Sequence, residues 1–343
     1  MWRVAGVAAA LGVGAAGVGA TPQLSFWSSA QVWANINTGF TSPILGDGSL
    51  TLNLPGDYRY NSAGSGMSST GVASQSYAIA AGQGGVDPVY DLVTGGGQFG
   101  FSYSAQAETA GLNLRTQVSV GSVDAQGQLA SPPNSYLYAY AYSQWNQQFH
   151  IAPTAARPAG SYGAILLGFT LDGSFPALSD PSVYNSASAW AQLATSFTDT
   201  AGVSYQSSFS ISVNAGDPGW TGARTVYKKL LFQYGTPFSI SGHQQAYAAT
   251  NGEADFFNTG RISSIELPFG AVLESGAQQA GLGELAGLYG MVYNSATVDA
   301  INTNWDFGNN GGGFTPPVPE PSSYALLLAG LGAVGLLARR RRA

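Results

Sequence analysis

The sequence has no cysteine and little charge. None of its 343 residues is Cys, and only 9% are Asp, Glu, Lys or Arg. The absence of cysteine excludes disulfides, thiolate metal sites and a thiol nucleophile. Helical proteins need Lys, Glu and Arg on their exposed faces, so this scarcity of charge, together with 47 glycines, favours strands and turns.

Positive charge is scarce between the two ends of the chain. Arg3 and Arg339–Arg342 account for five of the 12 basic residues, so the region 21–318 holds seven of them against 17 acidic residues, and its only lysines are Lys228 and Lys229. The region 21–318 is therefore acidic. Nucleic acids and anionic lipid surfaces both require a basic face, so neither is predicted as a partner of this region.

The N-terminal residues 1–20 have the composition of a secretory signal peptide. Arg3 is their single charge, an apolar run follows, and the small residues Val18 and Ala20 precede Thr21. Signal peptidases cut after such small residues, so we predict cleavage between Ala20 and Thr21. An uncleaved N-terminal anchor is the alternative.

The C-terminal segment has a different pattern. A Gly- and Pro-rich linker, residues 309–318, leads to a proline cluster, then to the apolar run Tyr324–Ala338, and finally to four arginines. As a helix at about 1.5 Å per residue, the apolar run spans about 22 Å, less than the roughly 30 Å of a bilayer core. Arginine is costly to translocate, so the cluster predicts a body outside the membrane. The residues predicted to act as the cytoplasmic stop are Arg339, Arg340, Arg341 and Arg342.

Pro319-Glu320-Pro321, the short apolar helix and the terminal arginines together resemble the PEP-CTERM protein-sorting signal, over residues 319–343. The resemblance implies a Gram-negative bacterium, recognition of Pro319, Glu320 and Pro321 by an exosortase, and release or transfer of the body beyond the inner membrane. It also implies an association with exopolysaccharide. The alternative is a simple tail anchor with a proline spacer.

The region 21–308 is predicted to be a β-rich extracytoplasmic body, because apolar residues recur at every second position in several stretches. An antiparallel β-sandwich is the expected fold class. The alternating runs are Phe99 to Ala107, Leu112 to Val120, Tyr136 to Tyr142, Ile165 to Leu171 and Val203 to Val213. The first two runs are predicted to form a hairpin.

The tyrosine run Tyr136, Tyr138, Tyr140 and Tyr142 allows two interpretations. Period-two aromatic residues most often pack a sheet core, so we expect them on the inner face of a strand. The alternative is an exposed platform that stacks sugars of a surrounding polysaccharide. The intervening residues complicate the choice because they are apolar too: Leu137, Ala139 and Ala141.

Other local signals are weaker. Ala187–Ala194 and Gln278–Leu288 are predicted helices, and Asp47-Gly48 and Asp172-Gly173 are predicted hairpin turns. The segment from Ala254 to Thr259 and on to Ala271 also resembles one that is common in the bodies of PEP-CTERM proteins, without bringing a catalytic residue.

No motif predicts a catalytic, cofactor-binding or metal site. Two GxGxxG matches lie inside the apolar end segments, and neither a P-loop nor a hydrolase nucleophile elbow occurs. His150 and His243, the only histidines, are expected to be solvated or hydrogen-bonded strand residues. Carboxyl pairs for glycoside hydrolysis could come from Asp87 with Asp91, or from Glu253 with Asp255. Such acids more often satisfy backbone donors in turns.

The sequence thus predicts an exported envelope or extracellular-matrix protein without enzymatic activity or cofactor, structural or adhesive and associated with exopolysaccharide. Its expected partners are signal peptidase, exosortase and, before processing, the inner membrane, which the C-terminal helix would span on the way to the cell surface. Alternatives are a secreted glycan-active enzyme and a single-pass protein that stays anchored in the inner membrane.

We expect the mature protein to lack both ends, because both apolar segments are short and both adjoin plausible cleavage sites. Intact-mass measurement on extracellular material tests this. If most of the exported protein retained Arg339–Arg342, a stable anchor would replace the sorting hypothesis.

Overall fold

The computed structural model describes residues 23–42, 46–62, 70–82, 96–132, 135–176, 186–276 and 292–299. All of them belong to the first of two units into which the chain divides, Met1–Asp299. The predicted signal peptide with its cleavage site at Ala20 and Thr21, the linker, the sorting signal with its apolar helix, and the helix predicted at Gln278–Leu288 lie outside these ranges. Within the ranges, no helix has the length and apolar character needed to cross a membrane.

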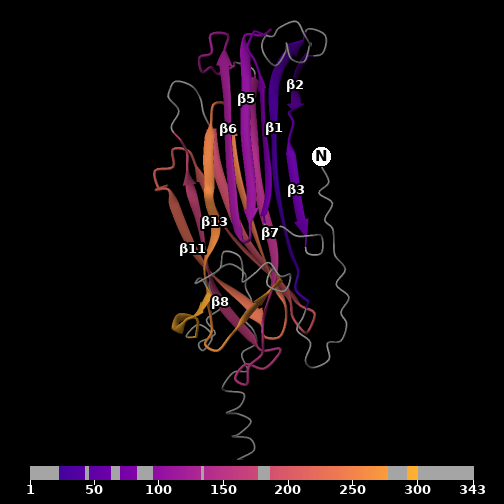
Figure 1. The fold of residues 1–343 in the computed structure, drawn as a ribbon, viewed down its shortest axis with the longest axis vertical. Helices are drawn as coiled ribbons and strands as arrows, with labels where there is room; N and C mark the ends of the chain where they lie inside the picture. The colour runs from indigo at the N-terminus through magenta and orange to yellow at the C-terminus, as the bar shows by residue number, and fades with distance from the viewer. Residues whose placement is uncertain are drawn as a thin grey trace, which may run out of the picture. The chain divides into compact units, whose positions relative to one another are not determined.

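The described strands form two sheets (Figure 1). Sheet A has the order β10-β9-β12-β7-β1-β2, with β3 beside β1 and β14 beside β7. Its strands are β1 (Phe26–Ser42), β2 (Gly46–Asn53), β3 (Asp57–Ser62), β7 (Ser135–Ile151), β9 (Ser186–Thr198), β10 (Ser204–Asn214), β12 (Phe238–Ala249) and β14 (Leu273–Ser275).

Sheet B has the order β11-β8-β13-β6-β5-β4, with β15 beside β13. Its strands are β4 (Thr70–Ile79), β5 (Phe99–Ala110), β6 (Asn113–Asp124), β8 (Tyr162–Ser174), β11 (Ala223–Gln233), β13 (Glu253–Leu267) and β15 (Val292–Asn294). Among the pairs of strands that can be described, the pairing of β13 with β15 is parallel and the others are antiparallel.

The pairing is nested, as in a jelly roll. The hairpin β9–β10 lies at the centre of the segment that runs from β6 to β13. Outward from this hairpin along the sequence, β8 pairs with β11, β7 with β12, and β6 with β13. Successive pairs alternate between sheet A and sheet B, which is the connectivity of two Greek keys. β1 and β2 extend sheet A beside β7, and β5 and β4 extend sheet B beside β6. The predicted β-sandwich is therefore confirmed for the described residues, with one parallel pair, β13 and β15, beside the antiparallel ones.

The predicted hairpin of alternating strands is β5 and β6. Its turn is at Gly111, whose φ of 60° lies in the left-handed region that glycine adopts without strain. On β5, Ala105 and Ala107 are buried, whereas Ser104 is exposed and Gln106 half-buried on the opposite face. The alternating run predicted at Ile165–Leu171 falls in β8, and the run from Val203 to Val213 falls in β10 except for its first residue.

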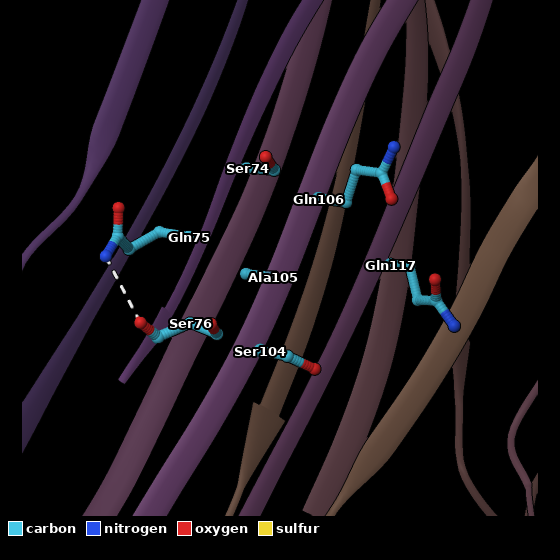
Figure 2. Close-up of a pocket in the computed structure, with 7 residues that line it drawn as sticks. All are labelled: Ser74, Gln75, Ser76, Ser104, Ala105, Gln106 and Gln117. Carbon is cyan, nitrogen blue, oxygen red and sulfur yellow. Dashed lines mark hydrogen bonds between the residues drawn. The ribbon is translucent and has the colours of Figure 1, made fainter. Parts of the chain in front are cut away.

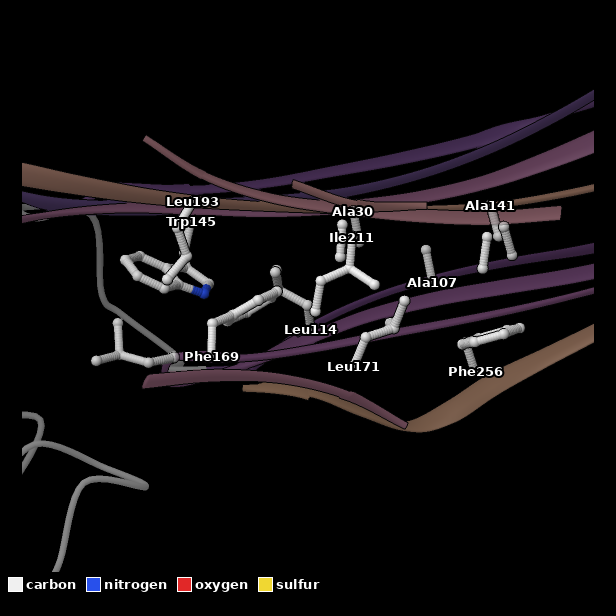
Figure 3. Close-up of a cluster of buried hydrophobic side chains, with 14 of the residues drawn as sticks. Ala30, Ala107, Leu114, Ala141, Trp145, Phe169, Leu171, Leu193, Ile211 and Phe256 are labelled. Atoms are coloured by element: carbon white, nitrogen blue, oxygen red, sulfur yellow. The ribbon is translucent and has the colours of Figure 1, made fainter. Parts of the chain in front are cut away.

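The core lies between the two sheets (Figure 3). Trp145 and Leu193 point inward from sheet A, and Phe169 and Leu114 from sheet B, and all four are fully buried. Burying one such side chain contributes about 1.5–3 kcal/mol relative to leaving it exposed, so this layer is the main source of stability.

The helix predicted at Ala187–Ala194 is wrong, because this segment belongs to strand β9. β9 pairs with β10 on one side and β12 on the other, and these pairings override the helical preference of alanine. Ala187, Ala189 and Ala191 occupy alternate, buried positions. The small side chains thus fill the inner face of a strand.

The two predicted hairpin turns are also wrong. Asp47-Gly48 lies within β2 and Asp172-Gly173 within β8. Gly173 is needed for a different reason, since a Cβ atom there would collide with the ring of Phe256. The glycine permits a close approach of the Phe256 ring to the strand, rather than a reversal of the chain.

The inner face of sheet A also carries buried polar groups. Ser28, Ser143 and Gln147 are fully buried, and neither amide atom of Gln147 has a hydrogen-bond partner among the described residues. A buried polar group without a hydrogen bond costs about 1–3 kcal/mol. These groups therefore lower the stability of the sandwich.

We expect Gln147→Met to raise the melting temperature, because an unbranched apolar side chain of similar length removes two unpaired polar atoms. The gain should be about 1–3 kcal/mol. Thermal unfolding of the exported protein measures it. The control is Gln106→Met on the outer face of β5, which should change stability little. A lower melting temperature for Gln147→Met would contradict the assignment.

Candidate functional site

The tyrosines of β7 lie on the outer face of sheet A, so the inner position predicted for them is wrong. Tyr136 is 45% exposed and the next three tyrosines along the strand are half-buried, whereas Leu137, Ala139 and Ala141 are fully buried between them. Ala139 pairs with buried alanines of both neighbouring strands, Ala34 of β1 and Ala248 of β12. Small residues on three neighbouring strands thus form the inner surface here, and the larger rings point outward.

Further aromatic side chains extend this row across the neighbouring strands. Trp33 of β1 stacks on Tyr140 with 4.9 Å between ring centroids and 18° between planes, and Tyr247 of β12 lies 4.9 Å from Tyr140 on the other side. Along β7, Tyr138 lies 5.8 Å from Tyr140 and 5.7 Å from Tyr136. We call this set the aromatic face; it consists of Trp33, Tyr136, Tyr138, Tyr140, Tyr142 and Tyr247.

Sequence reasoning missed Trp33 and Tyr247. The signal for both was the alanine beside them, since Trp33-Ala34 and Ala246-Tyr247-Ala248 repeat the large-small alternation of the β7 run. What the sequence could not give is the register that brings Trp33 and Tyr247 to either side of Tyr140.

Hydrogen bonds fix the two ends of the tyrosine row. The Asn37 amide donates to the Tyr136 hydroxyl at 2.9 Å, and Thr51 Oγ1 donates to the Asn37 carbonyl at 2.7 Å. At the other end, the Tyr142 hydroxyl lies 2.6 Å from His243 Nδ1 and 3.0 Å from Gln144 Oε1. Rings held in this way lose little freedom when they bind a ligand, which improves affinity.

The aromatic face lies on strands without formal charge. β1, β7, β9, β10 and β12, which are adjacent in sheet A, contain no Asp, Glu, Lys or Arg. Outward positions beside the aromatic rings are occupied by amides and hydroxyls, among them Asn35, Gln245 and Ser188. The surface therefore offers flat apolar rings and neutral hydrogen-bonding groups.

Three titratable side chains of this surface, Tyr140, Tyr142 and His243, have pKa values shifted towards their neutral forms. Burial raises the pKa of Tyr142 to about 12. Burial, together with the neighbouring hydroxyls of Tyr138 and Tyr136, also raises the pKa of Tyr140. Burial lowers the pKa of His243 below its ordinary value. A ligand on the aromatic face thus meets no ionised group from these side chains.

The predicted carboxyl pair lies on the other sheet. Glu253 and Asp255 occupy alternate positions of β13 and therefore share its outer face, beside Ser119 and Gln117 of β6. Asp255 accepts a hydrogen bond from the backbone of Phe257 at 3.1 Å, a local role that it fulfils within a strand and not in a turn. The other predicted pair, Asp87 and Asp91, lies outside the described residues.

Both histidines are hydrogen-bonded strand residues, as predicted. His150 Nδ1 lies 3.0 Å from Glu274 Oε2, and His243 contacts Tyr142. Over the part of the chain that the structure describes, no group of three or more His, Cys, Asp and Glu residues could hold a metal ion.

A shallow hollow of about 410 Å³ lies on sheet B across β4, β5 and β6 (Figure 2). Its lining is Ser74, Gln75, Ser76, Ser104, Ala105, Gln106 and Gln117. These residues can donate and accept hydrogen bonds, but none of them is an acid, a base or an activated nucleophile. The hollow can therefore offer hydrogen-bonding groups to a ligand.

Because the folded state binds a proton at His243 less readily than the unfolded state, stability should decrease as the pH falls. The unfolded pKa is about 6.5 and the folded one is lower, so unfolding takes up a proton between the two values and becomes easier there. Above about pH 6.5, His243 is neutral in both states, and its contribution to the free energy of unfolding no longer changes with pH. We expect the melting temperature of the wild type to drop more steeply below this pH than that of His243→Gln. Parallel slopes would contradict this assignment.

Comparison with known proteins identifies the C-terminal segment. Residues 317–342 match the family model described as the PEP-CTERM protein-sorting motif. The match includes the predicted recognition element and the predicted cytoplasmic stop, which are Pro319, Glu320, Pro321, Arg339, Arg340, Arg341 and Arg342. All of these residues lie outside the described ranges, so the cytoplasmic position of the arginines stays a prediction.

The other comparisons concern the whole chain. No curated protein matches the chain. Among solved structures, vicilin from Capsicum annuum is 8% identical over 68% of this chain and 75% of its own, with a TM-score of 0.09, too low to carry an argument. The motif indicates a protein that is exported to the cell surface or beyond and sorted by an exosortase, and we therefore identify the chain as a carrier of the PEP-CTERM protein-sorting motif.

Proposed function

We propose that the body is a structural or adhesive protein of the envelope or extracellular matrix and binds an uncharged exopolysaccharide on the aromatic face. The observation that carries this proposal is the row of stacked rings on strands that contain no charged residue. The body then acts by binding and not by catalysis.

The chemistry of the face suits a sugar polymer. A sugar ring has apolar C–H groups on its faces and hydroxyls around its edge. The C–H groups can pack on Trp33, Tyr140 and Tyr247, and the hydroxyls can bond to neighbouring amides such as Gln245. Since several rings lie in sequence along β7, an extended chain can contact more of them than a single sugar can.

The absence of charge favours a neutral polysaccharide over an acidic one. Carboxylate or sulfate groups on a polymer would lose water at the aromatic face without meeting Lys or Arg on β1, β7 or β12. The lysines that could pair with an acidic polymer, Lys228 and Lys229, lie on β11 of sheet B.

In the proposed export route, signal peptidase cuts between Ala20 and Thr21, and the short helix 324–338 holds the protein in the inner membrane, with Arg339–Arg342 on the cytoplasmic side. The exosortase then recognises Pro319, Glu320 and Pro321 and detaches the body. The presence of the PEP-CTERM protein-sorting motif supports this order of events.

A second candidate function is a glycan-active enzyme, favoured by the shared outer face of Glu253 and Asp255. In such an enzyme the two carboxyls would flank one glycosidic bond. An assay for new reducing ends, with the matrix polysaccharide as substrate, separates this function from binding alone. A loss of product formation in Asp255→Asn would establish the enzyme.

We expect Tyr138→Ala to weaken binding of the exported protein to a neutral matrix polysaccharide about tenfold or more. Its stability should fall by only about 1 kcal/mol, because the ring contacts other rings but is not in the core. A buried aromatic residue such as Phe169 would cost about 3–5 kcal/mol on truncation to Ala. Affinity electrophoresis and thermal melts measure the two effects.

The matched control is Tyr227→Ala, which removes a tyrosine that is 61% exposed on β11 of sheet B. Its binding should equal that of the wild type. Equal losses in both variants, or unchanged binding in Tyr138→Ala, would refute the proposed face. Tighter binding of an acidic polysaccharide than of the neutral one would refute the proposed ligand class.

A further inference from the structure

The strand β10 ends sheet A and, within the described ranges, is hydrogen-bonded on one side only, to β9. The other side of an edge strand presents a row of backbone N–H and C=O groups that can pair with another strand. Proteins usually protect such edges with charged side chains, with proline, with bulges or by covering them.

Two other strands at the ends of the sheets show such protection. β11, at the corresponding end of sheet B, carries Arg224, Lys228 and Lys229, which include the only lysines of the chain. At the opposite end of sheet B, the backbone of Ser74 in β4 donates to the Asp57 carboxylate of β3 at 3.2 Å.

Within the part of the chain that the structure describes, β10 shows none of these features. Its 11 residues contain no charged residue, no proline and no glycine. Its register with β9 runs without a bulge from Ser204 to Asn214. It is therefore a long, regular and neutral edge in a body that is otherwise acidic.

We propose that a second copy of this chain pairs with β10, antiparallel and symmetric about Phe209. Phe209 is the midpoint of Ser204–Asn214, so a twofold axis there aligns the whole strand with itself. In this register, a residue before Phe209 in one copy lies opposite the residue equally far after Phe209 in the other copy. Two such residues face the same side of the sheet, so the buried face of one copy continues as the buried face of the other.

The two faces of β10 fit this symmetry. Towards the core, Ile211 and Val213 are buried while Tyr205 and Phe209 are half-buried, so a second strand would cover apolar surface that one copy leaves partly open. Towards solvent, the exposed serines on either side of Phe209 would face each other across the axis, with no charge to repel. Elsewhere, the net negative charge opposes contact between copies.

Pairing through β10 would make sheet A continuous across the dimer. The aromatic faces of the two copies would then lie on the same side of one sheet, where a single polysaccharide chain or two neighbouring chains could contact both. Two linked sites raise the apparent affinity without any new contact. Dimer formation through β10 would thus strengthen the proposed binding of polysaccharide, but the dimer itself does not require that the aromatic face binds polysaccharide.

The test uses charge at the two serines that would meet, Ser208 of one copy and Ser210 of the other. Ser208→Lys with Ser210→Lys should abolish the dimer of the exported protein in sedimentation analysis, since each lysine would face a lysine of the other copy. Ser208→Glu with Ser210→Glu should do the same. A mixture of the two variants should restore the dimer, because every opposed pair is then of opposite charge.

The matched control is Ser102→Lys with Ser104→Lys on β5, an exposed pair of serines on a strand that is paired on both sides. This control should remain dimeric. A monomeric wild type, dimers that persist in the lysine variant, or a failure of the mixture to associate would overturn the proposal.

Polysaccharide binding by the lysine variant separates the two proposals. We expect the lysine variant to be a monomer that still binds the polysaccharide. Its apparent affinity should be lower than that of the wild type only because the second site is lost. Loss of the dimer without any fall in apparent affinity for a long polymer would refute the bivalent role.

Discussion

The pairing of β7 with β1 on one side and β12 on the other is the constraint on which the rest depends. It fixes which residues of β7 face the core, and because side chains alternate, it fixes the opposite face as well. Trp145 and Phe149 are fully buried on the inner side, and the tyrosines stand on the other. A shift of the register of β7 by one residue would expose Trp145 and Phe149 and bury the tyrosine row. Core packing and the aromatic face thus depend on one register.

The two outer faces of the sandwich differ in their chemistry, and the difference follows from where the few charges lie. On sheet B, Arg115 pairs with Glu108 at 3.0 Å and lies over the Phe257 ring at 5.9 Å. Such pairs near the surface contribute only about 0–1 kcal/mol to stability. The adjacent strands β1, β7, β9, β10 and β12 of sheet A have no charged residue to form such pairs. Sheet B therefore carries ion-paired side chains, whereas these strands of sheet A present aromatic rings and neutral hydrogen-bonding groups.

The sequence allowed correct predictions for the β5–β6 hairpin and for the sorting motif, but not for the turn dipeptides Asp47-Gly48 and Asp172-Gly173, which lie within strands. The β5–β6 hairpin alternates cleanly between apolar and polar residues, and the sorting motif is a linear string that needs no fold to be recognised. The β7 run was ambiguous because Leu137 and Ala139 are apolar as well, so periodicity alone could not tell inside from outside. The alanine-rich segment of β9 favours a helix when it is considered alone, and it becomes a strand because it pairs with β10 and β12. Strand register was the missing information in both cases.

The aromatic face and the sorting motif also place different demands on the chain. The motif lies within residues 317–342 and is one continuous stretch of sequence. The face joins Trp33, Tyr140 and Tyr247, which come together only after three strands far apart in sequence have paired. The match to the motif therefore carries no information about the outer faces of the body. The composition of the aromatic face is determined by the jelly roll, since that fold sets which side chains of β1, β7 and β12 point outward.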